Sequence, residues 1–285
     1  MSDPAVRVEV RPDGVAVLTI DQPGAKVNVL TVALWAELEA TIDVLAARTD
    51  VAGLVIASGK PGCFIAGADL HLLANATPGG PAVKAFIEQG LRVLGKLEAL
   101  PFPTCAAIDG VALGGGLEVA LACDIRVAGS NPKVQLGLPE VKLGLIPGWG
   151  GTQRLRRITT LRTALRLLLE GMTLSGHEAV EVILVDTDAP SEELIDAAAD
   201  YLPGYQPQDR VDLRAWRQAA TNVEIPSGIV VPDTTAAREA YRVTTEGHRL
   251  PLAEGIALET EAFLRLAGAD ESRAKIAAFF AARKR

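Results

Sequence analysis

Residues 108–128 read IDGVALGGGLEVALACDIRVA, with three consecutive glycines near the centre of the stretch. The small and apolar residues 105–108 predict a strand that ends at 109–110, and residues 116–123 predict a helix. Another strand is expected at 125–128. Glycines between a strand and a helix accept positive φ and let the backbone approach a ligand closely. The helix start also leaves N–H groups unpaired, which favours negative charge nearby.

Short strands and helices alternate on both sides of this stretch, through about residue 186. Residues 6–10 and 15–20 read as a hairpin, because valines alternate with polar residues around an Arg-Pro-Asp-Gly turn. Residues 32–47 have the one-sided apolar pattern of an amphipathic helix, and residues 54–56 read as a strand buried on both faces. This order predicts an α/β core with mostly parallel strands.

The last third of the chain changes character. Ala, Glu, Leu and Arg dominate four segments that are expected to be helical, namely residues 191–202, 234–247, 252–267 and 270–283. Residues 203–233 hold several prolines and glycines, so an irregular connector is predicted there. We therefore expect two parts, a core at residues 1–190 and a helical region at residues 191–285.

Composition limits the class of protein. The 285 residues are 49% hydrophobic and 22% charged, which is an ordinary globular balance. The net charge of −7 argues against general nucleic-acid binding. We find no apolar run as long as a membrane helix and no secretory signal, so a cytoplasmic protein that does not enter the membrane is expected. Cys63, Cys105 and Cys123 are expected to be buried free thiols.

Two acids, Glu118 and Glu140, follow glycine-bearing segments. In the first turn of a helix, Glu118 would stabilise the helix dipole by about 0.3–1 kcal/mol without any catalytic role. Glu140 follows Gly137-Leu138-Pro139 and precedes the glycine-rich segment 147–151, and such an acid is often a surface residue. If both face one cavity, they would form a general acid/base pair. The spacing alone leaves the structural and the catalytic interpretation open.

Other kinds of site are disfavoured by the motifs that the sequence lacks. The glycine triplet does not match the dinucleotide fingerprint, no Gly-Lys-Ser/Thr follows it, and no G-x-S-x-G elbow is present. His71, His177 and His248 are scattered and do not have the spacing of metal ligands. Neither a metal nor a nucleotide cofactor is therefore expected.

Three segments resemble the signature of the crotonase family, the enoyl-CoA hydratases and isomerases. They are FIAGADL (64–70), IDGVALGGGLEVALACDIRVA (108–128) and LGLPEVKLGLIPGWGGTQRL (136–155), and the resemblance covers roughly residues 5–190. It implies an α/β fold with a crotonase (ClpP-like) spiral core of stacked ββα units, followed by a helical C-terminal region. It also implies an acyl-CoA thioester as substrate, with coenzyme A as part of the substrate and no separate cofactor.

The resemblance implies a role for individual residues. Glu118 and Glu140 would be the catalytic carboxylates, with Glu118 activating water and Glu140 supplying a proton. The backbone N–H groups of Ala66 and Gly115 would form an oxyanion hole for the thioester oxygen. Further contacts with the acyl-CoA are expected from Lys26, Ile65, Gly67, Ala68, Asp69 and Gly114.

Glu118 and Glu140 are separated by 22 positions, and this spacing and the C-terminal segments resemble the hydratase part of the multifunctional fatty-acid β-oxidation alpha subunit. No dehydrogenase part is present, although a link to one is expected if the chain is a fragment. Trimers or hexamers are typical of stand-alone members, whereas the extra helices favour a monomer or small oligomer. Hydration of 2-enoyl-CoA is the first hypothesis, and isomerase or other enolate chemistry, or a non-catalytic CoA-binding role, are the alternatives.

One position departs from the family pattern. Ile183 stands where family members usually have the glycine of Gly-Leu-Val-Asp, and a β-branched residue resists the left-handed geometry that ends many helices. A different local turn is therefore predicted. Residues 187–235 also match the family poorly, which leaves the acyl-chain specificity open.

Overall fold

The structure, a computed structural model, describes residues 3–202, 207–221 and 223–283 and divides the chain into two units. Unit 1 comprises Met1–Ala68, Arg92–Leu136 and Leu174–Trp216, and unit 2 comprises Asp69–Leu91, Gly137–Thr173 and Arg217–Arg285. The chain thus alternates between the units. The division expected near residue 190 does not coincide with them, because the segment that follows it still belongs to unit 1.

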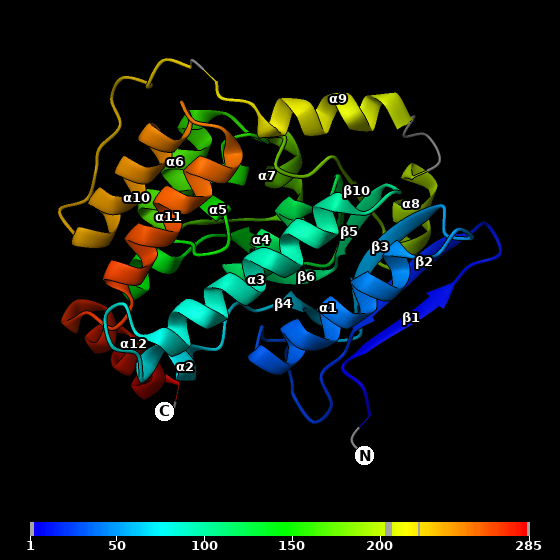
Figure 1. Ribbon diagram of the computed structural model, residues 1–285, viewed down its shortest axis with the longest axis horizontal. Coiled ribbons are helices and arrows are strands. Elements are labelled where there is room, and N and C mark those ends of the chain that lie inside the picture. Colours follow the sequence, from blue (N-terminus) through cyan, green and yellow to red (C-terminus); the bar gives the residue numbers. More distant parts are fainter. Residues whose placement is uncertain (1–2, 203–206, 222, 284–285) are drawn as a thin grey trace. The chain divides into compact units, whose positions relative to one another are not determined.

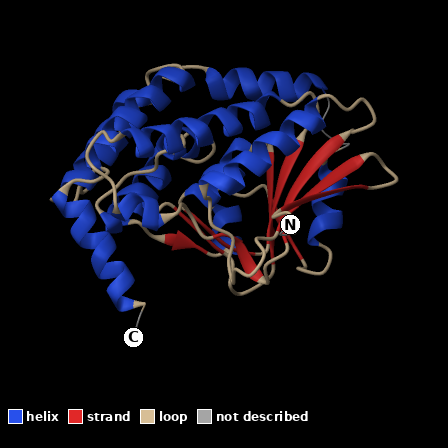
Figure 2. Cartoon of the chain, turned by 60° about the horizontal axis from the view of Figure 1, so that its bottom comes forward, coloured by secondary structure: helices blue, strands red, loops and turns tan. Residues whose placement is uncertain are grey.

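A six-stranded sheet forms the centre of unit 1 (Figures 1 and 2). Its strands, in their order across the sheet, are β1 (Val6–Val10), β2 (Val15–Ile20), β3 (Gly53–Ser58), β5 (Thr104–Ile108), β7 (Ile125–Gly129) and β10 (Thr187–Ala189). The hairpin pair β1–β2 is antiparallel, and every following pair is parallel. The predicted hairpin and the predicted parallel α/β core are therefore confirmed.

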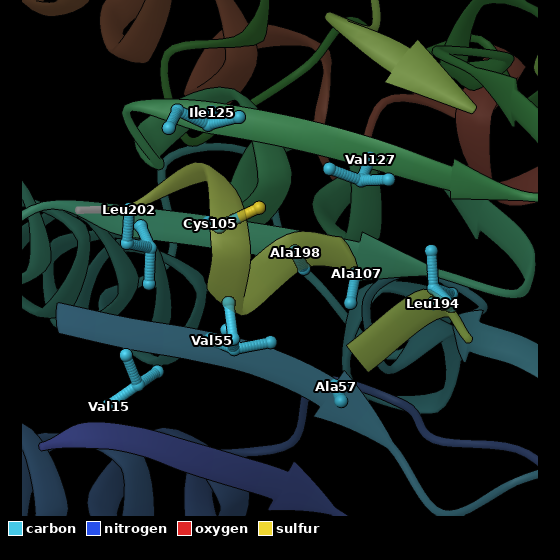
Figure 3. Close-up of a cluster of buried hydrophobic side chains, with 11 residues drawn as sticks. Val15, Val55, Ala57, Cys105, Ala107, Ile125, Val127, Leu194, Ala198 and Leu202 are labelled. Carbon is cyan, nitrogen blue, oxygen red and sulfur yellow. The ribbon is translucent and has the colours of Figure 1, made fainter. Parts of the chain in front are cut away.

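The central strands are covered on both faces. Every residue of β5 and β7 is buried, which explains why these segments are continuous runs of small and apolar residues rather than alternating ones. On one side the sheet packs against α8 (Leu194–Tyr201), whose Leu194 and Ala198 join Val55, Cys105 and Val127 in a buried cluster (Figure 3). This packing places residues 194–201 in unit 1.

A second sheet has the strand order β4 (Gly62–Ile65), β6 (Gly110–Leu113), β8 (Gln135–Gly137) and β9 (Thr173–Leu174). Within unit 1, β4 and β6 run parallel, with Gly62 opposite Gly110 and Ile65 opposite Ala112. The remaining helices assigned wholly to unit 1 are α1 (Val32–Ala46), α4 (Gly115–Ala122) and α7 (Gly176–Glu181). Helix α1 begins at the cap Thr31, whose side chain accepts a hydrogen bond from the Leu34 N–H group.

Unit 2 is helical in its described part. It contains α2 (Leu70–Ala74), the 3-10 turn η1 (Glu140–Leu143), α5 (Gly151–Leu155), α6 (Leu161–Glu170), α10 (Thr235–Gly247), α11 (Leu252–Leu266) and α12 (Asp270–Ala282). Helices α10 and α11 lie side by side and both contact α5 (Figure 1). The predicted helices at 191–202, 234–247, 252–267 and 270–283 are confirmed as α8, α10, α11 and α12.

Several helices were not predicted from the sequence, and α3 and α9 are the longest of them. Helix α3 (Pro81–Ala99) had no predicted counterpart, and α9 (Pro207–Gln218) lies inside the stretch predicted as an irregular connector. That prediction is wrong for α9. Its first residue is a proline, which is favoured in the first turn of a helix, and its arginines bind the core of unit 1. Residues 203–206 and 222 of the same stretch lie outside the described residues.

The turn at Ile183 is also not as predicted. Ile183 has a φ of 61°, so it keeps the left-handed conformation in which a glycine would be unstrained. The Leu184 N–H group donates to Ala179 O at 2.8 Å, which closes the end of α7. Ile183 therefore adopts a strained left-handed conformation, and the turn keeps the geometry that a glycine at this position would have.

The three cysteines are buried free thiols, as predicted. Among the residues that the structure describes, no helix is both long and apolar enough to span a membrane.

Candidate active site

Two adjacent loops in unit 1 follow the parallel strands β4 and β6. The first loop continues from Ile65 through Ala66, Gly67 and Ala68, and the second leads from β6 through Gly114 into α4. Because parallel neighbours end at the same edge of a sheet, the two loops lie beside each other. Such an edge is the usual place for ligand binding in α/β proteins.

Packing at this edge requires glycine at position 116, the last of the glycine triplet. A Cβ atom on Gly116 would lie 2.1 Å from the carbonyl oxygen of Ile65, a distance that no side chain can occupy. Gly67 has a φ of 122°, and a Cβ there would lie 3.4 Å from the carbonyl oxygen of Leu113. The close approach of α4 to Ile65 therefore requires glycine at position 116, whereas the positive φ of Gly67 is what favours glycine there.

The backbone donors of the two loops differ from the predicted set. Gly115 is the first residue of α4, and its N–H group makes no hydrogen bond within the described residues. The N–H group of Ala66 donates to Asn28 O at 2.8 Å, so it is already engaged and is not offered to a ligand in this structure. The N–H group of Ala68, two residues on, has no hydrogen-bond acceptor in the described part of the chain.

Asn28 holds the first loop in place and was not singled out from the sequence. Its buried side-chain amide donates to Ile20 O at 2.9 Å and to Phe64 O at 3.1 Å, while its own carbonyl oxygen accepts from Ala66. The Leu30 N–H group donates to Gly67 O at 2.9 Å. An asparagine within the apolar run Val27-Asn28-Val29-Leu30 was the signal that could have identified this role, since buried polar side chains need partners.

Lys26 lies two residues before Asn28 and is exposed. Its segment is therefore fixed to the loop after β4 through Asn28, while its side chain extends into solvent. Asp69 follows Ala68, and its carboxylate accepts a hydrogen bond from the His71 N–H group at 2.9 Å, capping α2. The structure thus gives Asp69 a capping role, and places it in unit 2.

Glu118 lies in the first turn of α4, one turn after the free N–H group of Gly115. It is 1% exposed, and its own N–H group donates to Gly114 O at 3.0 Å. Unit 1 therefore brings together Ile65, Ala66, Gly67, Ala68, Gly114, Gly115 and Glu118 on two neighbouring turns. A site with a buried carboxylate so close to its backbone donors is unsuited to a phosphate, because the carboxylate would repel the negative charge of the phosphate.

Glu140 belongs to unit 2, where it is the first residue of η1. The turn starts after Pro139 and ends at Gly144, whose φ of 70° is left-handed. Glu140 is half-buried, and its Oε2 atom is hidden from solvent without a hydrogen-bond partner in the described part of the chain. Burial raises the pKa of Glu140 well above its usual range, and the negative charge of Glu259 adds to the effect.

Glu259 on α11 is a further buried acid that the sequence analysis did not identify. Its carboxylate accepts hydrogen bonds from the N–H groups of Gly150 at 2.6 Å and Thr152 at 2.8 Å, and from the Thr152 hydroxyl at 2.6 Å. It is fully buried. No local pattern in the sequence marks this residue, since its partners lie more than 100 positions away.

A family model described as enoyl-CoA hydratase/isomerase matches residues 10–219, which is more than half of the chain. This chain belongs to the enoyl-CoA hydratase/isomerase family. The recognition made from the three glycine-bearing segments is confirmed at the level of the family. The closer resemblance to the multifunctional alpha subunit stays a prediction.

Solved structures agree with this assignment. The chain is similar to DspI of Pseudomonas aeruginosa, with 31% identity, a TM-score of 0.65, and coverage of 74% of this chain and 84% of that one. It is also similar to an enoyl-CoA hydratase of Geobacillus kaustophilus, with 28% identity, a TM-score of 0.65, and coverage of 99% and 96%. The human mitochondrial delta3-delta2-enoyl-CoA isomerase has the same fold, with a TM-score of 0.77, 23% identity, and coverage of 99% and 98%.

Hydratases and an isomerase both occur among these relatives, so the family membership leaves the reaction of this chain to its own residues. Among the described residues, no group of three His, Cys, Asp or Glu side chains has an arrangement that could hold a metal ion.

Proposed function

We propose that this family member is an enoyl-CoA hydratase, which adds water across the 2,3 double bond of 2-enoyl-CoA thioesters to give 3-hydroxyacyl-CoA in fatty-acid β-oxidation. The observation that carries the proposal is the presence of two glutamates in different settings, Glu118 buried and Glu140 half-buried with a hidden Oε2 atom. Glu118 stands close to the Gly115 N–H group, which has no acceptor among the described residues, and Glu140 is in an environment that favours its protonated form. Hydration needs one base and one acid.

The oxyanion hole is the first part of the proposed mechanism. When hydroxide adds to the β carbon, electron density moves to the thioester oxygen and an enolate forms. We assign the two donors to the N–H groups of Ala68 and Gly115, with Ala68 in place of Ala66 because the Ala66 N–H group already donates to Asn28. Loss of one such donor typically lowers the rate by about 10²–10³.

The two glutamates move the protons. Glu118 accepts a proton from the attacking water, whose oxygen bonds to the β carbon. Glu140 then gives its proton to the α carbon of the enolate. Each turnover leaves Glu118 protonated and Glu140 ionised, so a proton must return to Glu140 before the next one. The raised pKa of Glu140 suits the role of donor, because the carboxyl keeps its proton close to neutral pH.

Coenzyme A is bound as part of the substrate in this proposal, and no separate cofactor takes part. Lys26 is the residue proposed to contact its phosphates, since it is an exposed cation on the segment that Asn28 fixes to the loop after β4. The backbone from Ile65 to Ala68 is proposed to border the rest of the coenzyme.

The test is an assay with crotonyl-CoA and longer 2-enoyl-CoAs, which follows the loss of the absorbance of the conjugated thioester. We expect turnover by the wild type and a loss of about 10²–10⁴ in kcat for both Glu118→Gln and Glu140→Gln. Glu170→Gln, a change at an exposed acid at the end of α6, is the control and should leave the rate unchanged.

Two outcomes would contradict hydration. The first is a folded wild-type protein that turns over no 2-enoyl-CoA of any chain length. The second is a 3-enoyl-CoA isomerase activity that survives Glu118→Gln and disappears in Glu140→Gln, because a shift of the double bond needs the oxyanion hole and only one proton shuttle. Tight acyl-CoA binding without any product would instead indicate a non-catalytic relative.

A further inference from the structure

The turn η1, which begins at Glu140, is packed closely against the start of α12 in unit 2. A Cβ atom on Gly144, the left-handed residue that ends η1, would lie 3.1 Å from the Cα atom of Ser272 and 3.2 Å from its N atom. The two backbones thus approach each other without a side chain between them. Ser272 is fully buried, and its hydroxyl donates to Leu266 O at 2.7 Å. The end of η1 therefore rests on a part of α12 that is itself bonded to the end of α11.

The other end of α12 contacts α2, which also belongs to unit 2 (Figure 1). The rings of Phe280 and His71 are stacked, with their centroids 4.5 Å apart and their planes inclined by 20°. Helix α2 begins directly after Asp69, whose carboxylate accepts the His71 N–H group. Asp69 in turn follows Ala68, the proposed donor of the oxyanion hole. Helix α12 thus contacts the turn of Glu140 at one end and the helix that continues the Ala68 loop at the other.

One face of α12 makes both contacts. Ser272, Ile276 and Phe280 are spaced by four residues, which places them along one side of a helix. Ser272 and Ile276 are 0% exposed, and Phe280 is half-buried. Eight residues of a helix span about 12 Å, and the hydrogen-bonded backbone keeps that length constant. The buried face of α12 is therefore suited to hold η1 and α2 at a fixed separation.

We propose that α12 fixes the position of Glu140 for the reaction, and that Phe280 and His71 are positioning residues that act on Glu140 through α12 and η1. This inference rests on the proposed function of Glu140 as proton donor. The donor must stand beside the α carbon of the substrate, and a misplacement of about 1 Å can lower a rate by about 10²-fold. Helix α12 lies beyond residues 10–219, which the family model matches, so family membership does not assign it this part.

The direct test is amide hydrogen exchange in the full chain, which does not need activity. The exchange of η1 is read from three hydrogen-bonded N–H groups, those of Lys142, Gly144 and Leu145. We expect them to exchange about 2–10-fold faster in Phe280→Ala, the factor that corresponds to the loss of one aromatic pair. A folded Phe280→Ala protein in which these groups exchange as in the wild type overturns the proposal.

Phe279→Ala is the matched control. It removes the neighbouring ring of the same helix, which lies over Arg283 with 4.2 Å between the guanidinium carbon and the ring centroid. The Phe279 ring meets Phe280 only edge to face, with 5.8 Å between the centroids. Exchange in η1 should therefore stay as in the wild type. Equal acceleration by both variants would mean that α12 as a whole is loosened, and it would overturn the role of the stack.

The kinetic readout separates kcat from KM for hydration. Phe280→Ala and His71→Ala should each lower kcat by about 10-fold with KM unchanged, because the proton donor is misplaced while substrate binding is kept. The double variant should be no slower than either single one, since both remove the same contact. His71→Phe keeps a ring in the stack and should retain the wild-type kcat, as should Phe279→Ala.

Two kinetic outcomes overturn the proposal. A rise in KM with kcat unchanged would mean that the rings contact the substrate instead of positioning Glu140. A purely structural role of the stack would lower the stability of the protein and leave kcat per folded molecule unchanged.

A second variant covers the case in which Phe280→Ala does not fold. His71 is exposed, so His71→Ala removes the same stack without disturbing the core, and exchange in η1 should again become faster. Unchanged exchange in this variant overturns the proposal. A wild type that hydrates no substrate, with the expected exchange in the variants, would overturn the proposed function, while the link from the stack through α12 to η1 would stand.

Discussion

Ile183 ends α7 in a conformation that costs free energy. A left-handed residue with a side chain is less favourable by about 1–2 kcal/mol than one without, because Cβ approaches the following carbonyl oxygen. Ile183 has a φ of 61° and is 67% exposed, so little burial offsets this strain. The sequence identified the position as unusual, but it could not show that the surrounding hydrogen bonds would hold the turn in place.

Ile183→Gly should therefore stabilise the protein. We expect the free energy of unfolding to rise by about 1 kcal/mol, measured by urea denaturation. Val182→Gly is the control, since Val182 has a φ of −99° and should lose about 0.5–1 kcal/mol from the greater freedom of the unfolded chain. If the two variants lose stability alike, Ile183 is not strained.

Asn28 and Glu259 show why residues of the site were missed from the sequence. Each is one polar side chain in an apolar or helical pattern, and each acts through partners that fold next to it from elsewhere. Glu118 and Glu140 could be singled out from the sequence because glycine and proline, which mark special backbone geometry, stand beside them, and their catalytic role stays a prediction. The hydrogen bond from the Ala66 N–H group to Asn28 O, which argues against Ala66 as a donor, can be seen only in the folded chain.

At the scale of elements, α9 is attached to unit 1 by two ion pairs with the buried Asp124. Arg210 donates to Asp124 Oδ2 at 3.0 Å and to Leu100 O at 2.6 Å, and Arg214 donates to the other oxygen of Asp124 at 3.3 Å. Asp124 is only 3% exposed and also accepts the Thr104 N–H group. The helix is thus attached to the sheet through charge as well as through apolar contact.

Arg210→Met should lower the free energy of unfolding by about 3 kcal/mol, because it removes one partner of a buried carboxylate. Arg166→Met, which removes one partner of the exposed pair with Glu170, should change it by less than about 1 kcal/mol. Urea denaturation gives both values, and amide hydrogen exchange should show faster exchange along residues 208–216 in Arg210→Met alone. Equal effects of the two variants would show that α9 is held by other contacts.

The elements that could be predicted are those whose patterns are local. The hairpin, the buried strands at residues 104–108 and 125–129, and helix α1 follow from alternation, from continuous apolar runs and from helical spacing. Helix α9 was taken for a connector because it lies among prolines and its anchors are ion pairs to residues about 90 positions away. Long-range partners of this kind leave no periodic signal in the sequence.

At the scale of the whole molecule, the chain passes between the two units several times. A boundary drawn from composition near residue 190 precedes a stretch whose described residues form no strand, but α8 at the start of this stretch still packs on the sheet of unit 1 (Figure 3). Composition reports local preference, whereas membership of a unit is decided by which buried faces meet. Packing partners therefore have to be known before such a chain can be divided.

The last prediction concerns the pH dependence of stability. Burial raises the pKa of Glu140 in the folded chain, and in the unfolded chain the group has its ordinary pKa near 4.5. Between these two values the folded state holds a proton that the unfolded state has lost. The free energy of unfolding therefore falls as the pH rises through this window, because the folded state binds more protons there. The full loss of stability is reached only above the pKa that Glu140 has in the folded chain.

Glu140→Gln should remove this dependence, because an amide does not titrate. The difference in the free energy of unfolding, variant minus wild type, should be about 1–3 kcal/mol larger at pH 8 than at pH 5. This is the usual cost of a buried polar group without its hydrogen bond. Urea denaturation at the two pH values measures the gain, and taking the difference from the wild type cancels the other titrating groups. Glu254→Gln should show no such gain, since that side chain is exposed. A Glu140→Gln protein whose stability stays parallel to that of the wild type would mean that Glu140 titrates normally and is not the stored proton of the reaction.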